Sequence, residues 1–127
     1  MPRRLRSVWV TMKEIPIFGL NLAGYGADRE GVVAEIEAAE DMMRKHFGDP
    51  LRVDFDMALT DMQPEIITFI NNHSGQPGDP IFKLAIIGIP GWKRTWYRLT
   101  KKINWPKNAR FFDEHEKAKA WLITERF

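Results

Sequence analysis

One apolar segment limits the folds open to this chain more than any other part of the sequence. Residues 81–89 read IFKLAIIGI, a nearly continuous run of apolar side chains, several of them β-branched. A run of this length and composition predicts a strand that is covered on both faces of a sheet. Pro90 and Gly91 follow at once and are expected to end the strand.

The segment after this strand changes its hydrophobic period and predicts a helix. Between residues 92 and 103, one helical face collects apolar residues at positions i, i+4, i+7 and i+11: Trp92, Trp96, Leu99 and Ile103. We expect this face, including both tryptophans, to be buried. A buried strand followed by an amphipathic helix is half of a βαβ unit, so the rest of the chain should supply further strands and covering helices.

The remaining periodicities extend this unit to the order ββαβαβαβα. Strands are predicted at residues 7–12, 17–26, 51–59, 81–89 and 109–112, and helices after Asp28, after Thr60 or Asp61, at 92–103 and after Asp113. The first two strands should form an antiparallel hairpin at a sheet edge, because Pro16 lies between them. We therefore expect an α/β fold with one domain over residues 1–127, a mixed and mainly parallel sheet, and helices packed on it.

Composition narrows the chemistry and the compartment. The chain has no cysteine, which excludes disulfides, thiolate metal sites and a catalytic thiol. The basic residues at positions 3–6 are followed by no apolar signal core, and no run reaches the ~20 apolar residues that a membrane helix needs. We expect a cytoplasmic protein without a transmembrane segment.

Acidic and basic residues are segregated along the sequence. Acidic residues outnumber basic ones between residues 28 and 65, whereas every charged residue from Lys83 to Arg110 is basic. A bipolar surface of this kind could orient a homodimer or steer an anionic partner. The alternative is that solvated helix faces differ in charge without consequence, and the pattern alone leaves both open.

The glycines near residue 24 do not form a nucleotide-binding loop. Gly24 and Gly26 begin a G-x-G pattern, but Arg29 stands where the third glycine of a dinucleotide fingerprint belongs. We expect these glycines to serve a strand-to-helix turn, and we expect no cofactor.

Two carboxylates raise the question of a reactive site. In the strand predicted at 51–59, Arg52, Asp54 and Asp56 alternate with apolar residues and therefore share one face. Ligands bind near the carboxyl ends of strands in open α/β sheets, and two carboxylates ~7 Å apart could hold a raised pKa or a hard cation. We prefer the alternative, in which this face meets solvent or is covered by Arg52 and the basic helix, because no third ligand is evident.

The three histidines do not strengthen an enzymatic interpretation. His46 and His115 are expected on exposed helix surfaces, and no metal-binding spacing connects them. His73 lies beside Ser74 in a loop without the G-x-S-x-G motif of hydrolases. We therefore expect a protein that is not an enzyme and holds no metal, and we retain an enzyme using Asp54 or Asp56 as the least favoured hypothesis.

The basic helix at 92–103 has two interpretations. Its cations, next to aromatic residues, could contact an anion, a lipid headgroup, a nucleic acid or a protein partner: Lys93, Arg94, Arg98 and Lys101. Because Trp92 and Trp96 share a stripe with Leu99, we expect the aromatics to pack inward. That arrangement argues against nucleic acid and leaves an anionic group or a protein as the partner.

Several short motifs resemble the SpoIIAA-like family. They are residues 83–88 (KLAIIG), 92–96 (WKRTW), 109–114 (ARFFDE) and 117–122 (KAKAWL). The resemblance spans nearly the whole chain and implies a STAS-type domain, similar in fold to anti-sigma-factor antagonists and CRAL-TRIO lipid-binding domains. It also implies no established enzyme activity, and dimers or apolar ligands as partners.

One feature of anti-sigma-factor antagonists is missing from the sequence. The resemblance would place a phosphorylatable serine after the strand at 51–59, where this chain reads Leu59-Thr60-Asp61-Met62-Gln63. Thr60 could substitute for the serine, but a threonine beside Asp61 is also what a helix cap requires.

Three functional hypotheses follow from the sequence. The first is a non-enzymatic binding domain that holds a small apolar or lipid-like ligand beneath the aromatic helix, lined by Met57, Phe69, Trp92 and Trp96. The second is a dimeric protein-interaction module, and the third is the enzyme using the two aspartates. We prefer a combination of the first two.

Overall fold

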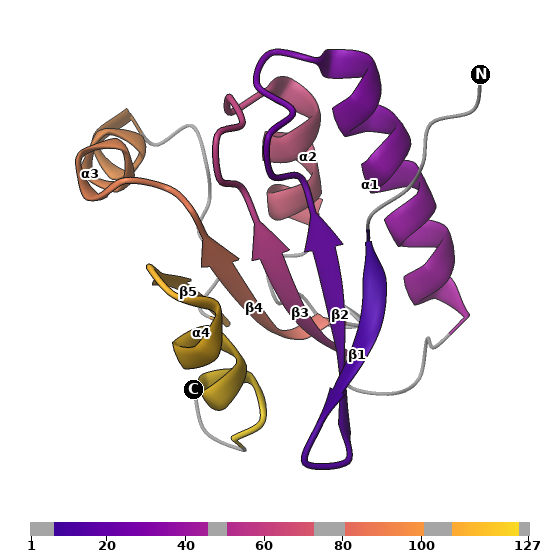
Figure 1. The fold of residues 1–127 in the computed structure, drawn as a ribbon. Coiled ribbons are helices and arrows are strands. Elements are labelled where there is room, and N and C mark those ends of the chain that lie inside the picture. Colours follow the sequence, from indigo (N-terminus) through magenta and orange to yellow (C-terminus); the bar gives the residue numbers. More distant parts are fainter. Residues whose placement is uncertain (1–6, 46–50, 73–80, 101–107, 125–127) are drawn as a thin grey trace.

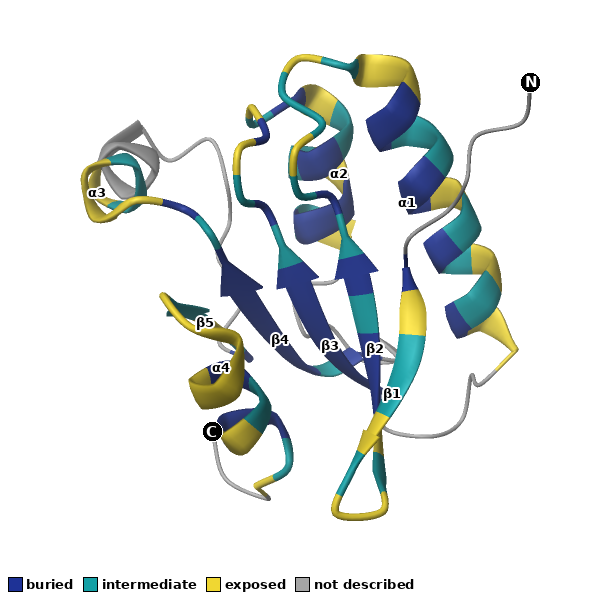
Figure 2. Ribbon diagram, in the orientation of Figure 1, coloured by how far each residue is buried: buried dark blue, intermediate teal, exposed yellow. Residues whose placement is uncertain are grey.

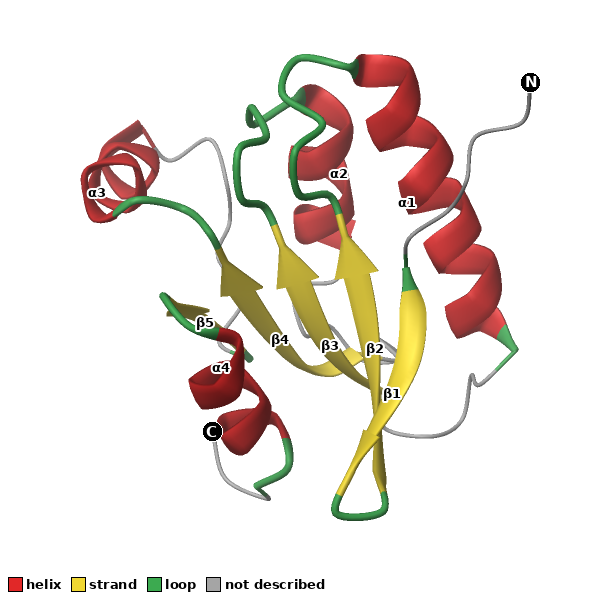
Figure 3. Cartoon of the chain, in the orientation of Figure 1, coloured by secondary structure: helices red, strands yellow, loops and turns green. Residues whose placement is uncertain are grey.

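The computed structural model follows the element order expected from the sequence (Figure 1, Figure 3). It describes residues 7–45, 51–72, 81–100 and 108–124, with the backbone alone for residues 96–100. The elements are β1 (Val8–Met12), β2 (Ile15–Asn21), α1 (Arg29–Arg44), β3 (Leu51–Asp56), α2 (Pro64–Asn72), β4 (Ile81–Ile87), α3 (Gly91–Thr100), β5 (Ala109–Phe112) and α4 (His115–Leu122).

The five strands form one mixed sheet in the order β1-β2-β3-β4-β5. β1 pairs with β2 in an antiparallel hairpin, and the other neighbours are parallel. The predicted α/β class and the terminal hairpin are confirmed. β2 ends at Asn21 rather than at Gly26, because Gly24 and Gly26 adopt positive φ angles of 77° and 56° and turn the chain away from the sheet.

Helices cover the two faces of the sheet unequally (Figure 1, Figure 2). α1 and α2 pack on one face, and the larger core lies between them and side chains such as Phe18, Val53 and Phe55. α4 packs on the other face, where a smaller core includes Ala85 and Trp121. β4 lies between both layers, and its burial confirms the strand predicted from the apolar run.

The placement of the polar face of β3 corrects one expectation. Arg52 and Asp54 are 8% and 5% exposed, so this face does not meet solvent. The element that packs against β3 there is α4, not the basic helix. The reason is topological: α4 follows the last strand and folds back over the face that the other helices leave open (Figure 1).

The position of Trp92 corrects another expectation. Its side chain is 71% exposed, although the helical stripe predicted burial. α3 begins beyond the carboxyl end of β4 and extends away from the sheet, so its first turn has no sheet surface beneath it (Figure 2). The side chain of Trp96 lies outside the described part of the chain.

Two buried charged residues connect helices to other parts of the fold. Glu35 of α1 is fully buried and accepts hydrogen bonds from the Ser7 backbone N–H at 2.9 Å and the Tyr25 hydroxyl at 2.8 Å. Lys83 of β4 is fully buried and donates to the Trp121 and Thr124 carbonyl oxygens, both at 2.8 Å. The ammonium group therefore satisfies carbonyls at the end of α4, where a positive charge is favoured.

Candidate functional site

A pocket of about 350 Å³ opens where β3 and β4 end. It is lined by Met57, Leu59, Thr60, Asp61, Met62, Gly88, Ile89, Pro90 and Lys93. We call it the rim pocket, because it lies at the carboxyl-end rim of the parallel strands. This is the edge at which open α/β sheets bind ligands, and the volume lies within the range of small-molecule sites.

The two loops that form the rim pocket are packed tightly against each other. The Met57 N–H donates to the Ile87 carbonyl at 2.8 Å and continues the strand pairing by one bond. Gly88 has a φ of 91°, and a Cβ there would overlap the backbone of Ala58. Only glycine meets both requirements, so the close contact between the loops depends on this residue.

Two large apolar side chains, those of Leu59 and Trp92, are exposed in the segments that follow β3 and β4. Leu59 lines the rim pocket, is 86% exposed and adopts a left-handed φ of 57°, which a leucine rarely does. Trp92 is next to Lys93 in the chain. The Lys93 Nζ lies 5.5 Å from the centroid of the Trp92 ring, in a cation–π contact. An exposed leucine held in an unfavourable backbone conformation is a feature more common at functional sites than elsewhere.

The structure separates the residues that the sequence grouped as ligand contacts. Met57 and Lys93 line the rim pocket. Phe69 belongs to the core instead, where it is 1% exposed and its ring centroid lies 5.5 Å from that of Phe55. Trp92 does not line this pocket. The side chains of Trp96 and Arg98, and Lys101 as a whole, lie outside the described residues.

Arg94 has structural partners at the base of α3. Its Nε donates to the Ile89 carbonyl at 2.8 Å, and its guanidinium forms an ion pair with Asp113 at 2.6 Å. The guanidinium also lies over the ring of Phe111. These contacts connect the start of α3 to β5 and to the segment before α4.

Thr60 ties two loops together rather than capping a helix. α2 begins at Pro64, so the predicted cap at Thr60 is wrong. The Thr60 hydroxyl is buried, accepts from the Tyr25 N–H at 3.1 Å and donates to the Leu22 carbonyl. A hydroxyl engaged in this way supports a structural role and gives no support to phosphorylation.

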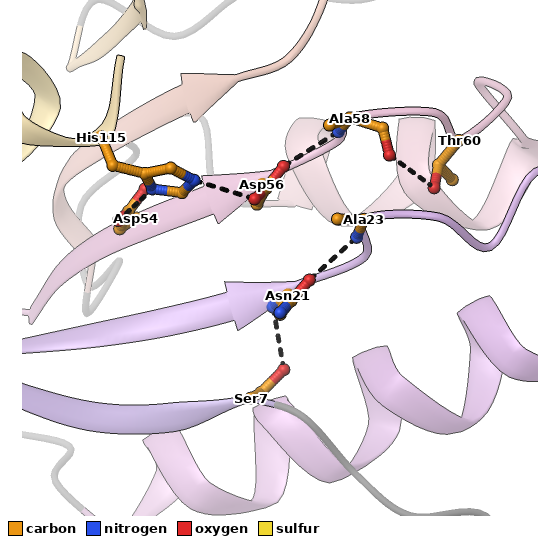
Figure 4. A network of polar contacts seen from close by, with 8 residues as sticks. All are labelled: Ser7, Asn21, Ala23, Asp54, Asp56, Ala58, Thr60 and His115. Atoms are coloured by element: carbon orange, nitrogen blue, oxygen red, sulfur yellow. Dashed lines mark hydrogen bonds and ion pairs between the residues drawn. The ribbon is translucent and has the colours of Figure 1, made fainter.

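His115 lies between the two aspartates of β3 (Figure 4). Its Nδ1 is 3.1 Å from Asp54 Oδ2, and its Nε2 is 2.9 Å from Asp56 Oδ2. Asp56 uses its other oxygen, Oδ1, to accept the Ala58 N–H at 2.9 Å. His115 is the first residue of α4 and its side chain is 47% exposed, so the predicted exposed helix position is confirmed. The sequence did not predict the contacts of both ring nitrogens with the aspartates of β3.

The environment of this Asp54–His115–Asp56 cluster shifts two pKa values. Burial raises the pKa of Asp54, and the hydrogen bond and positive charge of His115 offset only part of this effect. For His115, burial by itself lowers the pKa, but the hydrogen bond and charge of Asp54, and then those of Asp56, outweigh it and raise the pKa above 6.5.

The cluster does not form a metal centre. Among the described residues, no group of three histidine, cysteine or acidic side chains is placed to hold a metal ion. Both ring nitrogens of His115 face carboxylate oxygens, so neither nitrogen has a lone pair directed at an open position.

Comparison of the chain with models of protein families, with curated proteins and with solved structures found no match. None of the helices in the described ranges is both long and apolar enough to cross a membrane. The geometry of the rim pocket and of the Asp54–His115–Asp56 cluster is therefore the main basis for a functional interpretation.

Proposed function

We propose that this chain is a non-enzymatic, STAS-like binding domain that holds a small amphipathic ligand in the rim pocket. The observation that carries the proposal is the lining of that pocket. Its walls combine apolar and polar surface in similar amounts, and Lys93 supplies a cation at one side. Ligand sites of this kind combine apolar surface with a few polar groups that fix orientation.

The lining favours a short apolar tail with one anionic group. Met57, Met62 and Ile89 offer apolar contact, and methionine adapts to irregular shapes. Asp61 also lines the pocket and would repel a second negative charge placed near it. A singly charged amphipath, with its anion at Lys93 and its tail toward Met57, satisfies both constraints.

Calorimetric titration with octyl sulfate and with n-octanol tests this proposal, because the two probes share a tail and differ in charge. We expect saturable binding of both, with octyl sulfate binding more tightly. Lys93→Gln should remove most of this difference. Lys117→Gln is a matched control, because Lys117 is 73% exposed on α4 and does not line the pocket. Absence of saturable binding by both probes would overturn the proposal.

A dimeric interaction module is the second candidate, and the exposed side chains of Leu59 and Trp92 favour it. Leu59 lines the rim pocket and Trp92 follows β4, and large exposed apolar side chains of this kind are typical of the apolar centre of a protein interface. Sedimentation at several protein concentrations tests it. A dimer that dissociates on Trp92→Glu would support this function, whereas a monomer at every concentration would exclude the homodimer.

A further inference from the structure

We propose that His115 is a proton-controlled clamp on the rim pocket, acting through Asp56 and the loop at residues 57–60. This inference rests on the proposed function, since it assigns a regulation to the same pocket. It treats His115 as a positioning residue, because the imidazole does not line the pocket.

The first step is the number of protons that the cluster needs. An ionised carboxylate only accepts hydrogen bonds, whereas a neutral imidazole has one N–H and one lone pair. His115 has a carboxylate oxygen near each ring nitrogen, at 3.1 and 2.9 Å. Two hydrogen bonds therefore require either a doubly protonated ring or a neutral ring with one protonated aspartate. The reference state is a neutral His115 ring between two ionised aspartates. Each of the two hydrogen-bonded forms contains one proton more than this state.

The second step is the connection from the cluster to the pocket. Asp56 is the last residue of β3, and its two carboxylate oxygens contact His115 and the Ala58 N–H (Figure 4). Ala58 lies between Met57 and Leu59, which both line the pocket. The opposite side of this loop is held separately, by a bond from the Gly24 N–H to the Ala58 carbonyl at 2.7 Å. The orientation of Asp56 thus controls one of several hydrogen bonds that hold the loop, which also include the bond from the Met57 N–H to the Ile87 carbonyl and the bond from the Gly26 N–H to the Leu59 carbonyl.

The charged groups nearest to His115 are the two aspartates, so the protonation of its ring controls its contacts with Asp54 and Asp56. Asp54 and Asp56 of β3 face the ring, and Lys119 of α4 acts on Asp54. The other charged residues of the packed elements have separate contacts: Arg52 with Phe82, Lys83 with the end of α4, Arg110 with Trp121, Asp113 with Arg94, and Glu114 with Lys117. Glu116 is a further acidic residue in the first turn of α4.

Loss of the extra proton places a nitrogen lone pair against a carboxylate. One of the two hydrogen bonds is then replaced by repulsion. We expect Asp56 to move away from the ring, because its side chain is 16% exposed whereas that of Asp54 is 5% exposed and enclosed. Because the same carboxylate holds the Ala58 N–H, we expect the loop to loosen and the pocket to bind its ligand more weakly. The raised pKa of His115 means that this change falls above the ordinary histidine pKa of 6.5.

The test combines NMR with the binding of n-octanol, an uncharged probe whose affinity does not respond to net charge. The readouts are the pH titration of the His115 ring, that of the Ala58 amide, and the octanol affinity at pH values about two units either side of 6.5. We expect Ala58 to titrate with the His115 midpoint, and the affinity to fall by about fivefold or more at high pH. His115→Gln keeps a side-chain N–H donor but cannot titrate, so it should remove both changes.

The possible outcomes distinguish a failure of the His115 clamp from a failure of the proposed ligand binding. Octanol binding that is equally tight at both pH values would overturn the clamp and leave the proposed function in place. An Ala58 amide that titrates identically in the wild type and in His115→Gln would also overturn the clamp. No octanol binding at either pH, with octyl sulfate still bound, would overturn the clamp. No binding of either probe at either pH would refute the proposed function and, with it, a regulation of that site.

Discussion

Asp56 and His115 stand 59 residues apart in the chain, yet Asp56 Oδ2 and His115 Nε2 lie 2.9 Å apart. This contact joins the end of a central strand to the first residue of the last helix. It places a titrating group at the sheet edge where the rim pocket opens, because Asp56 immediately precedes the pocket residue Met57.

The stability of the protein should fall as the pH rises above 6.5. The pKa of His115 is higher in the folded than in the unfolded chain, so the folded state binds the proton more tightly. The resulting stabilisation is complete below the unfolded pKa and is lost as the pH passes through the folded pKa. Urea unfolding across this range measures it, and His115→Gln should flatten this part of the profile.

Asp54 should cause a second decline in stability with rising pH, at the acidic end of the pH range. Burial raises its folded pKa above 3.8, so its protonated form is favoured in the folded protein. Stability should therefore decline as the pH rises from 3.8 through the folded pKa of Asp54. In Asp54→Asn the decline should be absent from the same unfolding series. An unchanged profile in this variant would show that Asp54 does not titrate there.

Replacement of Lys83 by methionine should destabilise the fold by roughly 1–3 kcal/mol, because buried carbonyl oxygens at the end of α4 lose their donor. The Lys83 ammonium donates to the Trp121 and Thr124 carbonyls. Thermal and urea unfolding measure the effect, and the exposed Lys117→Met is the control, for which we expect little change. An equally stable Lys83→Met protein would mean that water replaces the ammonium.

Replacement of Leu59 by glycine should stabilise the fold while weakening the pocket. Leu59 has a φ of 57°, a conformation that glycine adopts without strain, so we expect a gain of up to about 1 kcal/mol. Glu14→Gly is a matched control, because Glu14 has a φ of 68° in the hairpin turn and does not line the pocket. Both variants should be more stable, but only Leu59→Gly should bind octyl sulfate more weakly. Equal binding by the two variants would remove Leu59 from the site.

The fold was largely predictable from the sequence because it rests on local periodicity. The apolar run at residues 81–89 and the alternation around Asp54 each predicted a strand, although the alternation did not predict that Arg52 and Asp54 are buried. The same reasoning failed for Trp92, because a helical stripe says which residues share a face but not whether a sheet lies beneath them. α3 starts past the end of β4, so Trp92, the first residue of the apolar stripe, is exposed to solvent.

The candidate site was less predictable because its contacts cross the chain. Asp54 and Asp56 were recognised as a pair, but His115 was not, since no local pattern fixes which strand α4 will cover. The rim pocket had one local signal, the Gly88-Ile89-Pro90-Gly91 sequence that ends the central strand. Its meaning depends on the contact between Gly88 and Ala58, which comes from two separate loops.

The most direct test of the central claim is a methionine methyl NMR titration with octyl sulfate. The chain has six methionines, of which Met57 and Met62 line the rim pocket, whereas Met12 is on β1 and Met43 is buried in α1. We predict saturable shifts of the Met57 and Met62 methyl signals, with Met12 and Met43 unchanged. Shifts at Met12 or Met43 without changes at Met57 and Met62 would contradict the binding function proposed for this pocket.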